Sequence, residues 1–357
     1  MFIKNKKFFY KHFGILISLI FIAFCIFISF FSYFLIPDDS QYSNQMHLSI
    51  HSMPPGFETY ILEMPNSSNY NQSYFNIKFF GKKFPNKEIV IKNYDLMKEG
   101  IKFENYSNEK LFVEYHLFQP DLSVKEIEKK YIKKRIFIFG TDSFGRDVFG
   151  RVVLGTRVSL SIGFIAVLIS LIIGLSIGML GGYYGGLVDK IVMTTINVFW
   201  SIPTLLLVIA ISVSLGKGFW QVYLAVGLTM WVEVARVVRG QVISEKNKDY
   251  IVATKVLGFS DIRIFIKHLL PNIIGPILII CAANFAAAIL IESGLSFLGI
   301  GTQPPIPSWG SMIKDNYQFI ILGKAYLAFI PGISIMLLVT SFMFLGNNLS
   351  DLFNDNK

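Results

Sequence analysis

Charged residues are scarce in this chain of 357 residues: they make up 16% of the sequence, whereas hydrophobic residues make up 53%. Soluble domains usually carry about 25% charged residues, so this balance is typical of a protein that crosses a bilayer several times. Cysteine is scarcer still. Cys25 and Cys281 each lie within an apolar run, which indicates small buried side chains and not a disulfide. No Cys/His cluster has the spacing of metal ligands, so the sequence predicts no metal site and no cofactor.

Catalytic signatures are also missing. The sequence contains no G-x-x-x-x-G-K-[ST] motif, which excludes ATP binding by a P-loop. It shows neither a Ser/His/Asp arrangement nor a pair of carboxylates suited to acid–base chemistry. We therefore predict that the chain is not an enzyme.

The net charge of +9 has an uneven distribution. Residues 38–150 contain 15 Lys/Arg and 15 Asp/Glu, so the whole excess lies in the apolar part and its short loops. This pattern does not indicate nucleic-acid binding. Short loops rich in Lys and Arg stay on the cytoplasmic side of a membrane. Two such segments are present. One precedes the first apolar run and contains Lys4, Lys6, Lys7 and Lys11, and the other includes the loop at residues 239–270 and contains Arg236, Arg239, Lys246, Lys248, Lys255, Arg263 and Lys267.

Six apolar runs are long enough to cross a bilayer, which takes roughly 20 residues. The first, Phe13–Ile36, is too long for a signal peptide and no small-residue cleavage site follows it, so we interpret it as a transmembrane helix whose N-terminus is cytoplasmic. The other five expected helices are Val158–Leu180, Ile191–Leu215, Phe219–Val238, Asn272–Glu292 and Tyr326–Leu345. The expected fold is an all-α polytopic membrane protein, with both termini in the cytoplasm.

Residues 38–150 form a polar segment that we expect outside the membrane, since long loops escape the charge rule. Alternating aromatic stretches predict strands at Tyr74–Phe80 and Lys110–Phe118, and Ser123–Arg135 is a candidate charged helix. The segment is thus an insertion with strand-forming stretches between the first two membrane helices. We favour a lid or spacer over a dedicated binding domain.

Prolines and charges near the membrane are candidates for a translocation path. Pro203 lies within an apolar run, where proline bends a helix. Glu233 and Arg236 have the spacing to form a pair on one helix face. Glu292 ends the fifth helix. It is a candidate to line the path or to cap a neighbouring loop, and we prefer the structural role.

The basic loop predicts two short helices joined by a turn. Asp249–Leu257 has helical spacing, and Gly258 is placed to end this helix in the left-handed conformation. Ser260 is a candidate N-cap for the second helix, and Pro271 is expected to stop or redirect the chain. A rigid partner docked here could tilt the adjoining membrane helices, although an ordinary surface loop would have the same pattern. The candidate coupling residues are Asp249, Tyr250, Ala253, Thr254, Leu257, Gly258, Leu270 and Pro271.

This loop resembles the cytoplasmic loop of ABC importer permeases, whose pattern is E-A-A, three residues, G, nine residues, I-x-L-P. Here Val252-Ala253-Thr254 occupies the E-A-A positions, followed by Gly258, His268 and Leu270-Pro271 at the family's spacing. Val252, Thr254 and His268 depart from the pattern. The missing glutamate concerns one charge contact with an ATPase, not the helix.

Further segments resemble the peptide-transporter branch of that family. They are Phe139–Asp142, Gly145–Val148, Gly155–Arg157, Gly181–Asp189, Glu292–Gly299 and Gln303–Gly310, and with the loop they cover residues 139 to 349. The resemblance is to the C-type permease subunit of dipeptide or oligopeptide importers, with a type I importer fold. It implies a second permease subunit, two separate ATPase subunits and an extracytoplasmic solute-binding protein as partners. Dipeptides, longer peptides, nickel chelates and glutathione all remain open as cargo.

The resemblance implies four parts along the chain. Residues 1–37 hold the cytoplasmic N-terminus and first helix, residues 38–150 the insertion, residues 151–349 the permease domain with its coupling loop at 239–271, and residues 350–357 a cytoplasmic tail. We expect the chain in a bacterial cytoplasmic membrane.

Two other functions are considered. A partner-independent secondary transporter or channel usually has coupling carboxylates at the membrane midplane or discontinuous helices, and neither is clear in the sequence. A membrane receptor with residues 38–150 as its sensor would need a signalling domain, and the tail after Leu345 is too short for one.

Overall fold

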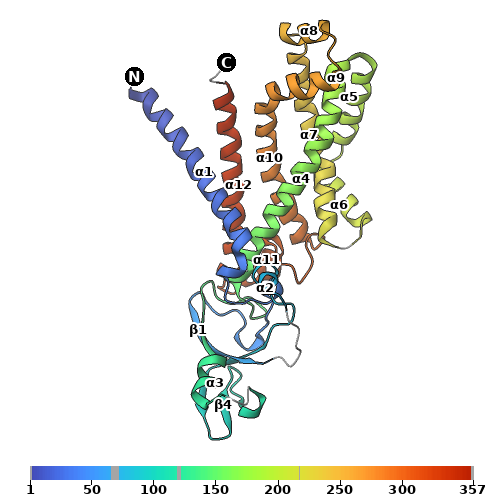
Figure 1. Cartoon of the computed structure of the whole chain (residues 1–357). Helices are drawn as coiled ribbons and strands as arrows, with labels where there is room; N and C mark the ends of the chain where they lie inside the picture. The colour runs from blue at the N-terminus through green and yellow to red at the C-terminus, as the bar shows by residue number, and fades with distance from the viewer. Residues whose placement is uncertain (1, 66–71, 119–121, 217, 355–357) are drawn as a thin grey trace. The chain divides into compact units, whose positions relative to one another are not determined.

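The computed structural model describes residues 2–65, 72–118, 122–216 and 218–354 (Figure 1). The chain divides into two compact units. The first comprises Met1–Ile26, Ser159–Gln303 and Ile333–Lys357, and the second comprises Phe27–Val158 and Pro304–Gly332. Three long helices run through both units: α1 (Phe2–Leu35), α4 (Val148–Tyr184) and α12 (Tyr326–Asn354).

The first unit is helical throughout its described residues. Besides its parts of the three long helices it contains α5 (Gly186–Trp200), α6 (Thr204–Ser214), α7 (Phe219–Glu245), α8 (Asp249–Val256), α9 (Asp261–Ile264), a π-helical stretch η4 (Phe265–Leu269) and α10 (Leu270–Leu298). Five described helices are long and apolar enough to cross a membrane, and a bent pair of helices adds a sixth candidate. The expectation of a polytopic α-helical membrane protein with six spans is therefore confirmed in its outline.

The third expected span is not one straight helix. Instead of a helix over Ile191–Leu215, α5 and α6 meet at an angle of 86° across Ser201–Pro203. Proline has no N–H to continue the helical hydrogen bonds, and its ring clashes with the carbonyl four residues before it in a helix. The Ser201 hydroxyl donates a 2.8 Å hydrogen bond to the Val198 carbonyl, which satisfies one of the oxygens at the end of α5. The chain therefore contains a discontinuous helix that was not clear from the sequence.

Two expected helix boundaries also differ. Helix α4 begins at Val148 and not Val158, so it includes Arg157, whose Nε donates to the Ser29 carbonyl at 2.9 Å. Pro271 does not stop the chain. It lies in the first turn of α10, where a missing N–H costs little, and the helical path from Asp261 to Leu298 is continuous through η4.

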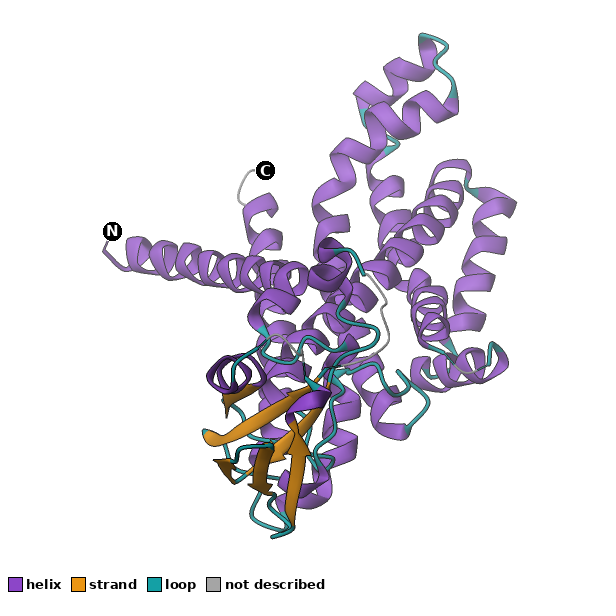
Figure 2. Cartoon of the chain, turned by 60° about the horizontal axis from the view of Figure 1, so that its bottom comes forward, coloured by secondary structure: helices purple, strands orange, loops and turns teal. Residues whose placement is uncertain are grey.

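The second unit holds two antiparallel sheets, drawn in orange in Figure 2. One sheet has the order β2-β1-β6 and the other β3-β4-β5. The strands are β1 (Phe57–Met64), β2 (Lys87–Ile91), β3 (Asn93–Leu96), β4 (Gly100–Glu104), β5 (Lys110–Glu114) and β6 (Ile132–Phe137). Their shared core is apolar and includes residues from both sheets and from α3 (Val124–Tyr131): Leu62, Ile91, Ile101, Phe103, Phe118, Ile127, Tyr131 and Ile132. The expected strand-containing insertion is confirmed.

Two local predictions within this unit need correction. Tyr74–Phe80 is not a strand but the short helix α2. It ends at Gly81, whose φ of 79° only glycine adopts easily. The candidate helix Ser123–Arg135 ends at Tyr131, and the residues that follow become β6 because they pair along β1, with Thr59 opposite Arg135. The strand expected at Lys110–Phe118 is correct for its first five residues.

Segments distant in the sequence meet in the second unit around a buried arginine. Arg146 donates from Nε to Asp142 at 2.7 Å, and its Nη2 lies 3.5 Å from Asp315 in α11 (Trp309–Asn316). The Trp309 indole donates a 3.0 Å hydrogen bond to the Val152 carbonyl of α4. These contacts fix residues 304–332 against the start of α4.

Candidate functional site

The loop between α7 and α10 forms the two-helix element expected from the sequence. Helix α8 ends in a Schellman motif: Gly258 has φ of 74°, its N–H donates to the Lys255 carbonyl at 2.9 Å, and the Phe259 N–H donates to the Thr254 carbonyl at 3.1 Å. Ser260 occupies the N-cap position of α9, although its side chain makes no capping hydrogen bond. The predicted stop at Gly258 is confirmed.

One face of this loop is buried against three membrane helices. Ile251 of α8 and Ile264 of α9 are fully buried, in one cluster with residues of α4, α7, η4 and α10: Met179, Tyr183, Val234, Val238, Val242, Leu269, Ile273 and Ile277. Close-packed interiors transmit displacement because they do not deform freely. A force on α8 is therefore passed to the ends of these helices.

The opposite face of the loop is apolar and exposed. Val256 is 83% exposed, Leu257 70% and Ile262 70%. Exposed apolar patches on a protein surface mark places where partners bind. Ala253 and Val252 lie on the same exposed side of α8.

Glu245 fixes the start of the loop. This residue is 3% exposed, and its carboxylate accepts hydrogen bonds from Lys248 Nζ at 2.6 Å and Tyr250 Oη at 2.7 Å. Burial and the hydrogen bond to Glu245 raise the pKa of Tyr250 to about 12, so the phenol remains a donor at physiological pH. Glu245 is not a predicted site residue, because its role depends on the path of the chain after α7.

The eight predicted coupling residues do not share one role. Asp249, Tyr250, Ala253, Leu257 and Gly258 are exposed on α8 and its turn, whereas Thr254 is buried and donates to the Ile251 carbonyl at 2.7 Å. Leu270 and Pro271 begin α10, separated from α8 by α9 and η4. Leu270 packs against the buried cluster beneath α8.

Polar contacts connect the loop to the turn between α4 and α5. The Asp261 carboxylate accepts from Tyr183 Oη and Tyr184 Oη, each at 2.8 Å. Lys246 Nζ donates to the Gly182 carbonyl at 2.8 Å. Arg239 of α7 forms a two-point ion pair with Asp189 of α5, with 2.7 Å between Nη2 and Oδ2. These pairings were not predicted because the partners lie far apart in the sequence.

A small cavity lies beside the break between α5 and α6. It has a volume of about 210 Å³ and is lined by residues of α5, α6, α7 and α10 together with the break itself: Phe199, Trp200, Ile202, Thr204, Leu207, Thr229, Met230, Val232, Glu233, Ala287 and Ile291. Pro203 is the N-cap residue of α6 at this break. Arg236 does not pair with Glu233 in the described part of the chain; it lies 3.6 Å from the centre of the Trp200 ring.

Glu292 has a different environment from Pro203. It is fully buried in α10 and accepts a 2.6 Å hydrogen bond from the Ser296 hydroxyl. Ser296 in turn accepts the Thr302 N–H at 3.0 Å, so the carboxylate supports the loop after α10. Neither Pro203 nor Glu292 lines the cavity beside the break, although their neighbours Ile202, Thr204 and Ile291 do.

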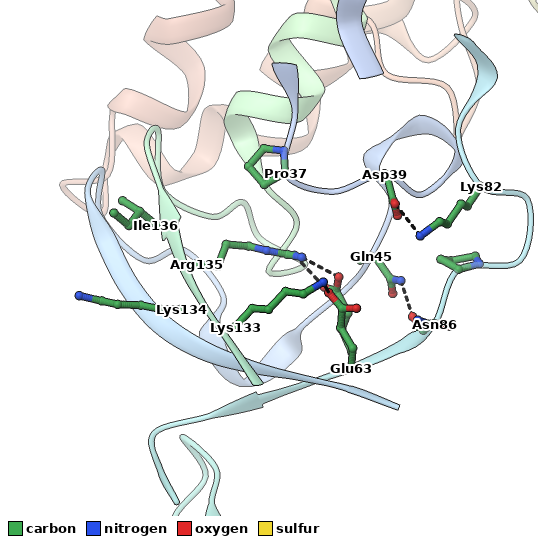
Figure 3. Close-up of a pocket in the computed structure, with 12 residues that line it drawn as sticks. Pro37, Asp39, Gln45, Glu63, Lys82, Asn86, Lys133, Lys134, Arg135 and Ile136 are labelled. Carbon is green, nitrogen blue, oxygen red and sulfur yellow. Dashed lines mark hydrogen bonds and ion pairs between the residues drawn. The ribbon is translucent and has the colours of Figure 1, made fainter. Parts of the chain in front are cut away.

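A larger cavity lies in the second unit, beside the sheet β2-β1-β6 (Figure 3). Its volume is about 420 Å³. Its cations are paired: Lys133 lies 2.7 Å from Glu63, Lys82 lies 2.6 Å from Asp39, and Arg135 binds both oxygens of Glu88 at 2.7 Å. The cavity therefore presents matched opposite charges and no free anion site among these residues.

His47 completes the buried charge cluster at this cavity. Its Nε2 lies 3.0 Å from Glu88 Oε2. Burial alone would raise the pKa of Glu88, but the hydrogen bond to His47 and the charge of Arg135 outweigh it and lower the pKa to about 2. The Glu88 carboxylate is thus a fixed negative charge that connects β2 to β6.

Long apolar helices, one of them broken, and a loop helix fixed to their ends define a polytopic membrane protein of the transporter class. Residues 170–354 match the model of the family described as binding-protein-dependent transport system inner membrane component. The chain belongs to this family and is a multi-pass inner-membrane permease. The resemblance inferred from the loop motif and the prediction of a transport subunit without an ATPase site are confirmed.

The relatives agree with this family. The chain is 44% identical over 213 residues to the dipeptide transport system permease protein DppC of Bacillus subtilis (strain 168), which covers 60% of this chain and 67% of the relative. It is 38% identical over 213 residues to the oligopeptide transport system permease protein OppC of Escherichia coli (strain K12), covering 60% and 70%. A chain of the MetNI methionine ABC transporter in an inward-facing conformation aligns with 19% identity and a TM-score of 0.47, over 57% of this chain and 96% of that chain.

Proposed function

We propose that this chain is one of two permease subunits of an ATP-driven importer for dipeptides or oligopeptides. The names of its relatives support the peptide cargo. The single observation that supports coupling to an ATPase is the exposed apolar face of α8, on a helix whose other face is packed against α4, α7 and α10.

In this proposal two ATPase subunits dock on the two permeases, and closure of the ATPases displaces α8. Val256 and Leu257 contact the ATPase, Glu245 and Gly258 hold α8 in position, and the buried cluster carries the displacement to the membrane helices. Val252 replaces the acidic residue of the family pattern, so this contact is apolar. The cavity beside Pro203 is the part of the path that this subunit contributes.

The proposed topology has both termini and residues 239–271 in the cytoplasm. Six spans, with α5 and α6 counted as one, return the chain to the side on which it began. The basic residues of the short loops support the cytoplasmic side. Residues 38–150 then lie outside, where a solute-binding protein delivers the cargo. The permease part begins near residue 151 and ends near residue 349.

The test compares Val256→Asp with Ile321→Asp. Both side chains are highly exposed, at 83% and 91%, so neither change disturbs a core. The tagged chain is purified in mild detergent from its native membrane, and co-purifying proteins are quantified by mass spectrometry. We expect Val256→Asp to lose the P-loop ATPases while Ile321→Asp retains them. Retention in both variants would contradict docking on α8.

Cargo is tested separately in proteoliposomes that contain the purified complex. Uptake of labelled dipeptides and longer peptides that requires ATP supports the proposal. Uptake only of a nickel chelate or of glutathione would leave the permease assignment intact and replace the cargo.

A secondary transporter is the second candidate, because the break between α5 and α6 is the kind of discontinuous helix such proteins use at their binding sites. It predicts that the chain alone moves solute in vesicles without ATP. Solute movement by the chain alone would favour this alternative over the importer.

A further inference from the structure

Helix α2 in the second unit exposes large aromatic side chains. Tyr74 is 66% exposed, Phe75 72% and Phe80 66%, and no residue of the helix is buried. Single exposed apolar residues are ordinary, but three exposed aromatic rings on a helix of seven residues expose more apolar surface than a helix surrounded by water usually does.

The helix is held against the end of α1 (Figure 1). The centres of the Phe79 and Phe34 rings lie 6.2 Å apart in an edge-to-face contact. Lys78 Nζ lies 5.1 Å from the centre of the Phe34 ring. A Cβ at Gly81 would come within 2.7 Å of Tyr33 Cε1, so only glycine allows this close approach. Each of these contacts belongs to the second unit.

Hydrogen bonds fix the position of α2 along the axis of α1. Arg157 donates from Nη1 to the Phe79 carbonyl at 2.7 Å and from Nε to the Ser29 carbonyl at 2.9 Å. After α2, the Lys82 N–H donates to the Asp39 carbonyl at 2.7 Å, just beyond the end of α1. Helix α2 therefore lies beside the last turns of α1, where the candidate span Gly14–Leu35 ends.

The last turns of α1, beside α2, also carry exposed apolar side chains. Phe27 is 54% exposed, Phe30 62% and Phe34 48%. On a membrane-spanning helix such side chains face lipid. Because Phe79 of α2 contacts Phe34, the exposed aromatic rings of α2 lie next to this surface. Helices that lie in a membrane interface carry Trp, Phe and Leu on the side that enters the lipid.

We propose that α2 is an interfacial helix, with Tyr74, Phe75 and Phe80 inserted at the boundary between the headgroups and acyl chains of the bilayer. Lys78 and Lys83 stand on the same short segment, where long cationic side chains reach lipid phosphates while their stems stay in the apolar layer. The occupant of this surface is lipid and not a protein partner, because the patch is continuous with α1. The assignment holds whichever side of the membrane residues 38–150 occupy.

The test measures the depth of a spin label on the full-length chain. Cys25 and Cys281 are replaced by alanine, a single cysteine is introduced by Phe75→Cys, and the labelled chain is placed in nanodiscs of phosphatidylcholine and phosphatidylglycerol. Accessibility to oxygen, which concentrates in lipid, is compared with accessibility to a water-soluble nickel chelate. Phe80→Cys provides a second position if Phe75→Cys does not fold.

Two reference positions frame the result. Phe30→Cys on α1 reports lipid, and Phe112→Cys on β5, 49% exposed in the same unit, reports water. We expect the oxygen-to-nickel ratio at Phe75 to resemble that at Phe30 and to exceed that at Phe112 several times. A ratio equal to that at Phe112 would overturn the proposal, and so would a label that neither reagent reaches, since that result indicates a protein partner over α2.

Discussion

Tyr183 and Asp261 lie 78 positions apart in the sequence, yet the Tyr183 hydroxyl donates a 2.8 Å hydrogen bond to the Asp261 carboxylate. This contact joins the end of α4 to the first residue of α9. Tyr184 donates to the second carboxylate oxygen, and Lys255 Nζ lies 4.6 Å from the centre of the Tyr183 ring. The loop that carries α8 is therefore attached to α4 by side-chain contacts as well as to α7 and α10 by the chain.

Replacing Asp261 tests this attachment. Asp261→Ala removes the acceptor of both tyrosines, so we expect faster amide hydrogen exchange in α9 and reduced ATP-driven uptake, with unchanged membrane insertion. Tyr184→Phe is the control, because Tyr184 is 50% exposed whereas Tyr183 is 8% exposed. Tyr183→Phe should therefore accelerate exchange in α9 more than Tyr184→Phe does. Equal exchange rates in Asp261→Ala and the unmodified chain would contradict a role for this contact.

The turn at Gly258 gives a second prediction. Apart from the two adjoining residues, no described residue has an atom within 4 Å of a Cβ built at this glycine, so a substitution acts mainly through the backbone angle. Gly258→Val should cost about 1–2 kcal/mol at a φ of 74°, since a β-branched residue disfavours the left-handed region. Gly258→Asn should cost much less. We expect the amount of co-purifying ATPase to fall for valine and to remain near normal for asparagine.

Equal loss of ATPase in the two variants would point to the added side chain and not to backbone strain. If both variants retain the ATPase equally, binding of the ATPase does not depend on the backbone conformation at Gly258.

Local signals in the sequence were sufficient for some elements and insufficient for others. The stop at Gly258 could be predicted because one residue with positive φ decides it. Tyr74–Phe80 was wrongly predicted as a strand because alternating aromatic residues also occur in short helices. No side chain of α2 is buried, so its hydrophobic pattern does not reveal which kind of element it forms. The break at Ser201–Pro203 was underestimated because proline alone does not determine whether a helix bends slightly or breaks.

Contacts between distant segments could not be predicted. The hydrogen bonds to the Asp261 carboxylate and the pairing of Arg135 with Glu88 depend on which elements lie side by side. Hydrophobic periodicity gives the elements but not their neighbours. In the loop, the fixed spacing of the family pattern supported the prediction of the two short helices and the turn between them. Residues 38–138 match no such pattern, so their contacts could not be predicted.

The charge cluster of the second unit predicts a dependence on pH. The pKa of Glu88 is about 2 in the folded protein and near 4.5 when unperturbed, so its ionised form stabilises the fold above pH 4.5 and this stabilisation is lost as the pH falls toward 2. The full contribution is roughly 3 kcal/mol, at 1.36 kcal/mol for each pKa unit. Hydrogen exchange of β1, β2 and β6, corrected for its intrinsic pH dependence, should therefore accelerate between pH 4.5 and 3.

Glu88→Gln removes the charge at every pH. It leaves Arg135 buried without its carboxylate, a change that typically costs about 3–5 kcal/mol. Glu58→Gln is the matched control, because the pair of Glu58 and Lys134 is exposed and such pairs contribute little. Protection of β6 that survives Glu88→Gln at pH 7 would exclude the pair as the main link between β2 and β6.

The last prediction concerns the loop after α10. Ser296 is 1% exposed, donates to Glu292 and accepts the Thr302 N–H, so Ser296→Ala should cost about 1–3 kcal/mol and loosen Gly299–Gln303. Ser293→Ala is a close control, because the buried Ser293 hydroxyl has no hydrogen-bond partner among the described residues and its loss should have almost no effect. Hydrogen exchange of residues 299–303 measures both variants. The role of Glu292 is tested with Glu292→Gln. If Glu292 acts in the translocation path and not as a support, this variant will alter uptake and leave exchange at these residues unchanged. If Glu292 supports the loop, the variant will accelerate exchange there.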